Sequence, residues 1–175
     1  MHRYVQCTLV QIFNDQKILL GMKKRGLGVG MWNGFGGKVE AGEDLKTAAA
    51  RELKEESGLE VLTSNLMEVG LLLFEFVNSG VVLEANVFRA VEYKGVVTES
   101  EEMRPCWFDI KDIPYKDMWV DDVDWFPLMF KQKLFYGFMK FTEKNEMFSQ
   151  ELKVLENVEE FKRLNKLQLM KYDFK

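Results

Sequence analysis

Three glutamates near the middle of the chain have the spacing of a metal site. Glu52, Glu55 and Glu56 stand at i, i+3 and i+4, so on a helix their carboxylates converge within about one turn. Three like charges that close repel one another unless a cation lies among them. Oxygen ligands without histidine or cysteine select Mg²⁺ or Mn²⁺ over zinc, and Mg²⁺ commonly takes further oxygens from substrate phosphates. The spacing therefore predicts a Mg²⁺ site, with Mn²⁺ as the second ion, that acts on a di- or triphosphate.

A single helix is predicted to carry these glutamates. From Asp44 to about Ser57, apolar residues recur at helical spacing, and the same stripe continues onto Glu52 and Glu56. The apolar members of the stripe are Leu45, Ala48 and Ala49. Gly58 is predicted to end the helix, because glycine readily adopts the left-handed conformation of a helix C-terminus. The apolar residues should seat the helix on a sheet and aim the glutamates along the same inward face.

The rest of the sequence predicts a β-rich fold with few helices. Apolar or alternating runs bounded by turn residues indicate strands, and two of them flank Asn78-Ser79-Gly80 as a hairpin. The predicted strands are 3–13, 17–24, 66–77, 81–93, 106–110, 134–141 and 148–155. A second helix is expected to start at Asp121 or Asp122 as N-cap, and residues 156–170 indicate a final helix. This order is α+β in type.

Composition narrows the class of protein. The chain has 175 residues, of which 47% are apolar and 30% charged, as expected for one globular domain with an adequate core. Cys7 and Cys106 form no CxxC motif, so a reducing compartment is expected. The N-terminal residues lack the pattern of a signal peptide, and no apolar run approaches the roughly 18 residues of a membrane span. We expect a soluble, cytoplasmic protein that does not bind membranes, with nuclear or mitochondrial sharing left open.

Net charge and histidine content disfavour a nucleic acid partner and several classes of catalytic site. The net charge of −4, without a long Lys/Arg block, argues against a polymeric nucleic acid partner. A small anionic ligand stays open, because a metal can offset the charge. His2 is the only histidine and there is no GxSxG or GxxxxGK[ST] motif, which disfavours histidine-dependent triads, zincin helices and Walker-type phosphate sites.

The spacing around the glutamates resembles the box of the Nudix hydrolase superfamily. The pattern is Gly37, five residues, Glu43, seven residues, Arg51-Glu52-Leu53, one residue, Glu55-Glu56, one residue and Gly58-Leu59. The resemblance implies the Nudix fold, a mixed curved sheet flanked by helices as an α/β/α sandwich. It also implies hydrolysis of a nucleoside diphosphate linked to another moiety, by attack of metal-activated water on phosphorus.

The same resemblance implies roles for individual residues. The implied metal ligands are Gly36, Glu52, Glu55, Glu56 and Glu102, and the implied catalytic residues are Arg51, Glu52, Glu55 and Glu56. Glu52 and Glu56 are the first-choice ligands, Glu55 is a further ligand or the base, and Gly36 contributes its carbonyl. Which glutamate deprotonates the water stays open. Arg51 can neutralise and orient a neighbouring carboxylate, and adjacent glycines let the backbone approach phosphates closely.

Segments outside the box resemble one subfamily, the animal oxidised purine nucleoside triphosphatases, often called 8-oxo-dGTPases. They are LLGMKKRG at 19–26, WNGFGGKV at 32–39, FEFV at 74–77, EMRPCWF at 102–108 and KDMWVDDVDWFP at 116–127. The resemblance covers roughly residues 4–155. It implies Mg²⁺-dependent hydrolysis of oxidised purine nucleotides such as 8-oxo-dGTP and 2-oxo-dATP to the monophosphate and pyrophosphate, which would cleanse the nucleotide pool and prevent DNA damage.

The subfamily resemblance also implies a substrate pocket. The implied substrate-binding residues are Thr8, Lys23, Asn33, Phe74, Trp119, Asp121, Asp122 and Phe141, with the first two near the sugar and phosphates. Trp119 and Phe74 offer flat apolar surfaces for a purine, although ordinary core aromatics would look the same in sequence. Asn33 can donate and accept at one purine edge.

Asp121 and Asp122 carry the sharpest prediction for the pocket. Two neighbouring carboxyls in an aromatic environment repel each other and lose solvation, so one should hold a proton and donate while the other accepts. Exchange of protonation states would let one pocket accept both oxidised guanine and oxidised adenine nucleotides. The simpler alternative is that one of them only caps a helix beginning at Asp122.

Some residues depart from the subfamily pattern. Leu27 and Leu83 stand where the mammalian proteins carry Phe and Met, which leaves the ranking of substrates open.

Residues 1–155 are expected to form the Nudix domain, and residues 156–175 an extension that packs as a helix on that domain. The apolar stripe of this extension is Val158, Phe161, Leu164 and Leu167. A partner or dimer surface is the alternative for the extension, and a monomer is expected.

Two other functions compete with this hypothesis. One is a Nudix hydrolase for another nucleotide, such as a methylated purine triphosphate or a dinucleoside polyphosphate. The other is a catalytically silent domain that senses a nucleotide. The intact box glutamates disfavour the sensor, because a binding module has no need of a costly carboxylate cluster.

Overall fold

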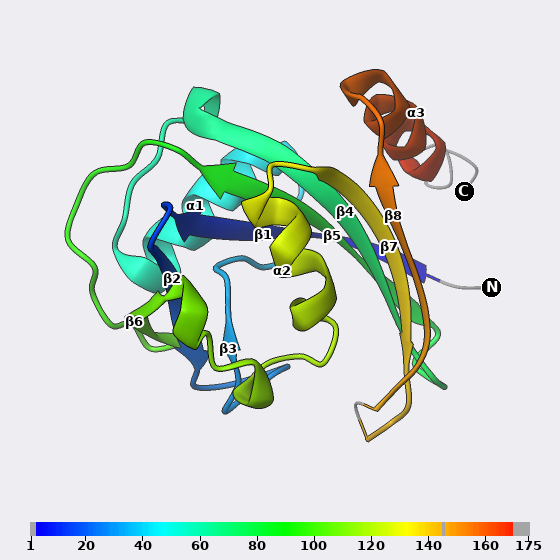
Figure 1. Cartoon of the computed structure of the whole chain (residues 1–175), viewed down its shortest axis with the longest axis horizontal. Helices are drawn as coiled ribbons and strands as arrows, with labels where there is room; N and C mark the ends of the chain where they lie inside the picture. Colours follow the sequence, from blue (N-terminus) through cyan, green and yellow to red (C-terminus); the bar gives the residue numbers. More distant parts are fainter. Residues whose placement is uncertain (1–2, 145, 170–175) are drawn as a thin grey trace.

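A mixed β-sheet forms the centre of the protein and curves around one helix (Figure 1). The computed structural model of the chain describes residues 3–144 and 146–169. The strands are β1 (Arg3–Phe13), β2 (Lys17–Lys23), β3 (Trp32–Asn33), β4 (Leu66–Phe76), β5 (Val81–Ala90), β6 (Met103–Asp109), β7 (Leu134–Phe141) and β8 (Met147–Leu155). Their order is β3-β2-β1-β5-β4-β7-β8, and β6 pairs with β2. The pairs β1·β5 and β4·β7 are parallel, whereas the other pairs are antiparallel.

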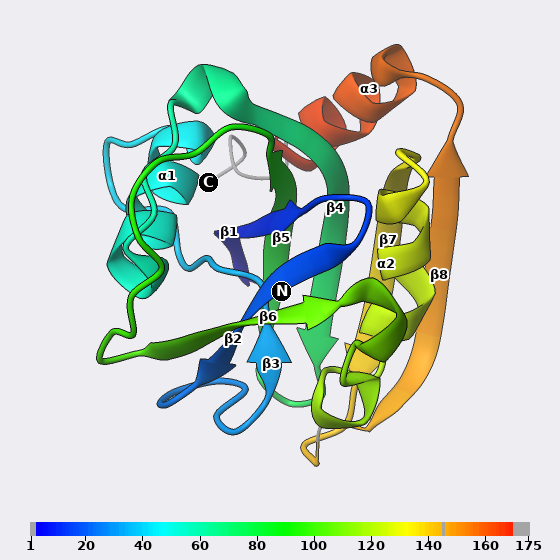
Figure 2. The ribbon, with the colours of Figure 1, turned by 60° about the vertical axis from the view of Figure 1, so that its left-hand side comes forward.

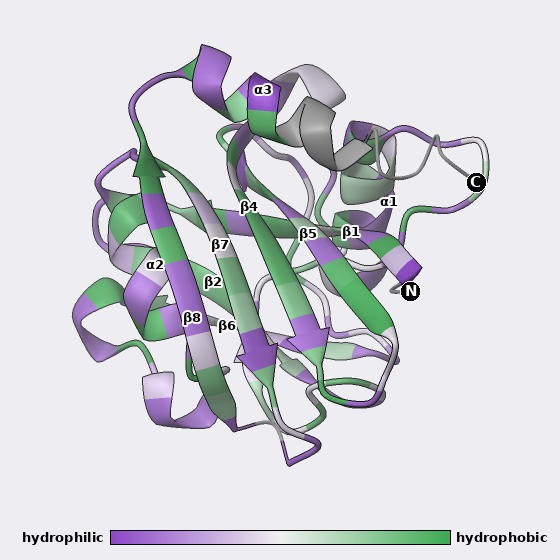
Figure 3. Cartoon of the chain, turned by 90° about the vertical axis from the view of Figure 1, so that its right-hand side faces the viewer, coloured by the Kyte–Doolittle hydropathy of each residue, from purple (hydrophilic) through white to green (hydrophobic). Residues whose placement is uncertain are grey.

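In the described residues, three α-helices cover the two faces of this sheet. They are α1 (Leu45–Ser57), α2 (Asp122–Phe130) and α3 (Val158–Leu169), and short 3-10 helices span Thr63–Asn65, Ile110–Asp112 and Tyr115–Asp117. Helix α2 packs on the face that carries Leu72 and Val87, and α1 packs on the opposite face against Phe88. Helix α3 covers the same face as α1, over β4 and β7 (Figure 3). The predicted α+β fold with helices on both faces is thus confirmed.

Helix α1 forms where its sequence predicts. The Asp44 carboxylate accepts the Thr47 backbone N–H at 2.8 Å, which satisfies one of the free donors at the N-terminus of the helix. Gly58 ends the helix with φ 75° and donates its N–H to the Lys54 carbonyl. Ala49 and Leu53 are fully buried against the sheet. The helix is therefore fixed at both ends and along its inner side.

Strand β6 is longer than its sequence suggests. The prediction began at residue 106, but the strand begins at Met103 and pairs with all of β2, with Pro105 opposite Gly21 (Figure 2). Proline cannot donate to a strand ladder and is confined mainly to edges. It is tolerated here because β6 pairs with β2 alone. This pairing brings the segment that starts at Glu102 to the end of β2.

The last helix packs on the domain through part of its predicted stripe. Phe161 is buried against Leu71 and Leu155, and Leu164 packs against the same cluster, whereas Val158 is exposed. The side chain of Leu167, like residue 170 at the end of the predicted helix, lies outside the described residues. None of the described helices is long and apolar enough to cross a lipid bilayer.

Candidate active site

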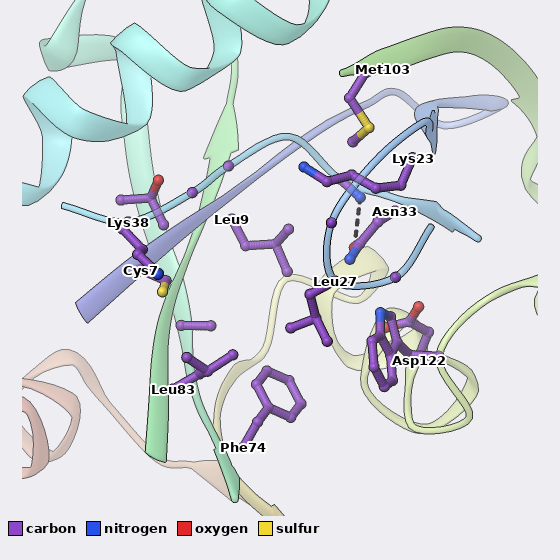
Figure 4. Close-up of a pocket in the computed structure, with 18 of the residues that line it drawn as sticks. Cys7, Leu9, Lys23, Leu27, Asn33, Lys38, Phe74, Leu83, Met103 and Asp122 are labelled. Carbon is purple, nitrogen blue, oxygen red and sulfur yellow. Dashed lines mark hydrogen bonds between the residues drawn. The ribbon is translucent and has the colours of Figure 1, made fainter. Parts of the chain in front are cut away.

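A cavity of about 660 Å³ opens between the concave face of the sheet and the loops around α2 (Figure 4). Seven of the eight predicted substrate residues line it, namely Thr8, Lys23, Asn33, Phe74, Trp119, Asp121 and Asp122. Gly36 and Glu102 from the implied metal set also line it. Cys7 and Lys38 lie at one end and Asp122 at the other, with Leu27 and Asn33 between them. Residues from seven separate segments of the chain are thus brought to one cavity.

Phe141 does not belong to this lining. Its side chain is fully buried, and its ring stacks on Phe76 with centroids 5.4 Å apart. Phe141 also meets Trp119 edge to face at 5.5 Å and lies 6.2 Å from Phe74. Phe141 therefore supports the aromatic rings that face the cavity, rather than facing it.

The two aspartates are buried at one end of the cavity. Asp121 is fully buried, and its Oδ2 accepts the Trp125 indole N–H at 3.1 Å. Burial raises the pKa of Asp121 to about 6, and burial together with the charge of Asp121 raises the pKa of Asp122 well above its ordinary value. Asp121 Oδ1 and Asp122 Oδ2 have no hydrogen-bond partner among the described residues. The pair therefore presents one free oxygen from each carboxyl.

The helix-capping alternative does not describe either aspartate. Asp121 occupies the N-cap position of α2, but its side chain makes no capping hydrogen bond, and Asp122 is already helical. The reason is that the Asp121 carboxylate is turned inward to Trp125, a residue that the sequence did not single out.

Raised carboxyl pKa values predict how stability changes with pH. Because the pKa of Asp121 rises from 3.8 to about 6, the folded protein binds more protons than the unfolded chain between these values. Rising pH should therefore lower the stability of the wild type relative to Asp121→Asn, by about 1–3 kcal/mol between pH 4 and pH 7. Denaturant unfolding of both proteins across this range measures the difference, and parallel curves would contradict the shift.

The box glutamates are less tightly grouped than their spacing predicts. Glu56 is buried at 2% exposure, the side chain of Glu52 is 14% exposed and that of Glu55 is 59% exposed. No group of three or more His, Cys, Asp or Glu in residues 3–144 and 146–169 is arranged to hold a metal ion. Arg51 binds Glu52 and Glu55 on one side, and Lys23 binds Glu56 on the other.

Lys23 and the Gly36 backbone hold Glu56. Lys23 Nζ donates to Glu56 Oε1 at 3.2 Å and to Glu102 Oε2 at 3.4 Å. The Gly36 N–H donates to Glu56 Oε2 at 2.9 Å. Burial nevertheless raises the pKa of Glu56 to about 7, since these donors only partly offset its lost solvation. Arg25 also pairs with Glu102, which ties the segment after residue 99 to the end of β2.

Arg51 organises the other side of the box. Its guanidinium donates to Glu43 Oε1 at 2.6 Å, to Glu52 Oε1 at 2.9 Å and to Glu55 Oε2 at 3.2 Å. It also donates to the Lys38 carbonyl at 3.2 Å. Arg51 therefore holds Glu52 and Glu55 of α1 beside the segment that follows the glycines.

The donor set fits a hard divalent cation. Its atoms are carboxylate and carbonyl oxygens, and Glu56 and Glu102 already share a positive group, the Lys23 ammonium. Gly37 leaves room for a carboxylate beside the backbone, because a β-carbon there would lie 2.5 Å from Glu52 Oε1. A side chain at Gly37 would therefore push the Glu52 carboxylate aside.

Gly37→Ala should lower kcat/KM about tenfold, because the added methyl group displaces the Glu52 carboxylate and small displacements of reacting groups are costly. Steady-state kinetics with a Mg²⁺ titration measures the change, together with a thermal melt. An unchanged Mg²⁺ requirement in a fully folded variant would contradict the assignment.

Sequence reasoning missed several residues of the cavity. Lys38 reaches it because Cys7 and Lys38 form an isolated antiparallel bridge, and neither residue had a predicted role in binding. Leu27 and Leu83 were named only as departures from the subfamily pattern, and both point toward the predicted Phe74 in the cavity (Figure 4). The position of Lys38 directly after Gly37 was the one local signal, since a cation next to the glycines suits phosphate binding.

Residues 3–129 match the NUDIX domain, so the chain belongs to the Nudix family. Hydrolases of this family generally use a divalent metal.

Particular relatives are similar over most of the chain. An oxidized purine nucleoside triphosphate hydrolase from Danio rerio is 48% identical over 151 residues, which cover 86% of this chain and 96% of the relative. A protein of the same name from Mus musculus is 49% identical over 150 residues, 86% of this chain and 95% of the relative. A solved structure of a MutT protein from Bacillus halodurans is 26% identical, covers 85% of this chain and 97% of its own, and has a TM-score of 0.72.

Proposed function

We propose that this protein hydrolyses oxidised purine nucleoside triphosphates, such as 8-oxo-dGTP and 2-oxo-dATP, to the monophosphate and pyrophosphate. The observation that carries the proposal is one cavity with an acidic, aromatic pocket at one end and the box carboxylates beside it. Asn33, Asp121 and Asp122 supply donors and acceptors for a purine edge. The high identity to proteins named for this reaction supports the same substrate class.

The phosphates of the substrate would lie between the purine pocket and α1. Lys23 and Lys38 line this part of the cavity and can contact phosphate oxygens. Glu52, Glu56 and the Gly36 carbonyl, with Glu102, would hold Mg²⁺, which supplies Lewis-acid and template chemistry when bound. Mn²⁺ is the alternative ion, because both prefer oxygen ligands. Glu52, Glu55 and Glu56 stay the candidates for the base that removes the proton from the attacking water.

The proposal includes a monomer that acts on a small nucleotide without nucleic acid polymers or membranes. The net charge of −4 disfavours a phosphate backbone as partner. Cys7 and Cys106 are both free, which suits the reducing cytoplasm. The proposed role is to remove mutagenic nucleotides before a polymerase incorporates them.

A different modified purine nucleotide is the second candidate. Leu27 is 56% exposed at the cavity and, with Leu83, presents branched apolar surface rather than a flat ring. Such a surface tolerates substituents of different shape, including a methyl group on the purine.

A competition assay tests the proposed function. We expect 8-oxo-dGTP and 2-oxo-dATP to be hydrolysed in preference to dGTP and O6-methyl-dGTP at low equal concentrations with Mg²⁺. Pyrophosphate as the product places the cleaved bond between the α and β phosphorus atoms, whereas orthophosphate would overturn that assignment. Preference for O6-methyl-dGTP would favour the second candidate, and tight binding without turnover would favour a sensor.

A further inference from the structure

Gln11 is a fully buried amide on β1 that has no visible structural purpose. Its side chain is 0% exposed, and neither Oε1 nor Nε2 has a hydrogen-bond partner among the described residues. Its neighbours along the strand, Val10 and Ile12, are apolar core residues. Burying an unpaired amide costs free energy, and an apolar side chain of similar size would avoid this cost. We therefore expect the Gln11 amide to gain a hydrogen-bond partner in another state of the site.

The Gln11 amide lies directly against the segment that presents Asn33. A β-carbon at Gly34 would overlap Gln11 Nε2, so the absence of a side chain at Gly34 is what lets the amide approach the backbone. The Gly34 N–H donates to Asn33 Oδ1 at 2.8 Å, which is the dashed bond in Figure 4. Gln11 therefore stands behind the peptide that fixes the orientation of the Asn33 side chain.

This arrangement sets up a competition when a purine binds. Asn33 Oδ1 is already occupied by the Gly34 N–H, so turning it toward a purine donor leaves that N–H without its partner. A half-turn of the Gln11 amide exchanges its nitrogen and oxygen and places an acceptor beside Gly34. We propose that Gln11 is a positioning residue, whose Oε1 accepts the Gly34 N–H when Asn33 turns its own oxygen to a bound purine. This inference rests on the proposed function.

Arg89 is the other polar neighbour of Gln11. It is the partner of Gln11 in the parallel β1·β5 register, and its buried Nε has no hydrogen-bond partner among the described residues. Its guanidinium lies over the Phe13 ring, 4.3 Å from the centroid. If the Gln11 amide instead stabilised Arg89, replacing Gln11 would change the free energy of unfolding. The change would be the same with and without the Asn33 side chain.

The test uses Gln11→Met, which keeps the shape of the side chain and removes both polar atoms. KM for 8-oxo-dGTP, and the Kd for 8-oxo-dGMP, should rise about threefold to tenfold, the worth of one neutral hydrogen bond, while kcat stays within twofold. Gln11→Glu keeps an acceptor oxygen at the same position and should restore KM to within twofold of the wild type. Asn86→Leu is the matched control, since it removes another fully buried amide that lies away from Gly34, and it should leave KM unchanged.

A double-mutant cycle separates positioning from packing. In an Asn33→Ala background, Gln11→Met should change KM less than twofold, because no side-chain oxygen then competes for the Gly34 N–H. Additive effects of the two substitutions on KM would overturn the inference, and so would an unchanged KM in Gln11→Met. Because the cycle does not use Gln11→Glu, it tests the inference even if that variant fails to fold. If the wild type neither binds 8-oxo-dGMP nor hydrolyses the triphosphate, the proposed function fails instead.

Discussion

Glu56→Gln should lower kcat by at least about 100-fold, since metal and electrostatic contributions of several kcal/mol depend on this carboxylate. The side chain is buried, with Lys23 and the Gly36 N–H both donating to it. Glutamine keeps the shape but removes the charge and turns one acceptor into a donor, which then faces one of these donors. Single-turnover experiments with saturating Mg²⁺ measure the change in the rate of the chemical step.

Two further variants control this experiment. Glu99→Gln removes an exposed carboxylate that pairs with Lys24 at 2.8 Å outside the cavity, and it should leave kcat within twofold. Glu55→Gln should have an effect smaller than Glu56→Gln, because the Glu55 side chain is 59% exposed and, among the described residues, pairs with Arg51 alone. A folded Glu56→Gln protein with near-normal Mg²⁺-dependent turnover would refute the assignment of Glu56.

Asp122→Asn should lower kcat/KM for one class of oxidised purine by about 100-fold while the other class loses much less. A site built to hydrogen-bond a base rejects a mismatched edge strongly, because buried polar groups are then left unpaired. The wild-type pair can exchange roles by moving a proton, since burial raises both pKa values. An asparagine cannot exchange its donor for an acceptor in this way without rotating. Initial rates on 8-oxo-dGTP and 2-oxo-dATP at several pH values measure the ratio.

Asp121→Asn should also change the ratio of the rates on 8-oxo-dGTP and 2-oxo-dATP. The change should differ in direction or size from that in Asp122→Asn, because Asp121 also accepts the Trp125 indole N–H. Asp124→Asn is the matched control from the same acidic run. Its carboxylate is bound to the exposed Gln150 amide at 2.9 Å, so both rates should be unchanged. If Asp121→Asn and Asp122→Asn each lower the rates on both base classes equally, the exchange of protonation states is contradicted.

The local elements of the fold followed from the sequence. Helix α1 begins after Asp44 and ends at Gly58 as predicted, because a capping side chain and a left-handed glycine act within a few residues. The hairpin of β4 and β5 turns at Asn78 and Gly80, both of which have positive φ. Strand β6 began three residues earlier than predicted, because Pro105 is unusual in a strand, and the two-residue strand β3 was not predicted.

The sequence by itself determined the family resemblance, the helix that carries Glu52, Glu55 and Glu56, and most of the residue types that line the cavity. Only the tertiary structure decided that Lys23 joins Glu56 across 33 positions and that Phe141 lies behind the cavity wall. The reason is physical. Caps and turns are decided by neighbouring residues, whereas these contacts depend on strand order, register and the packing of α2 against β7, which no local pattern encodes.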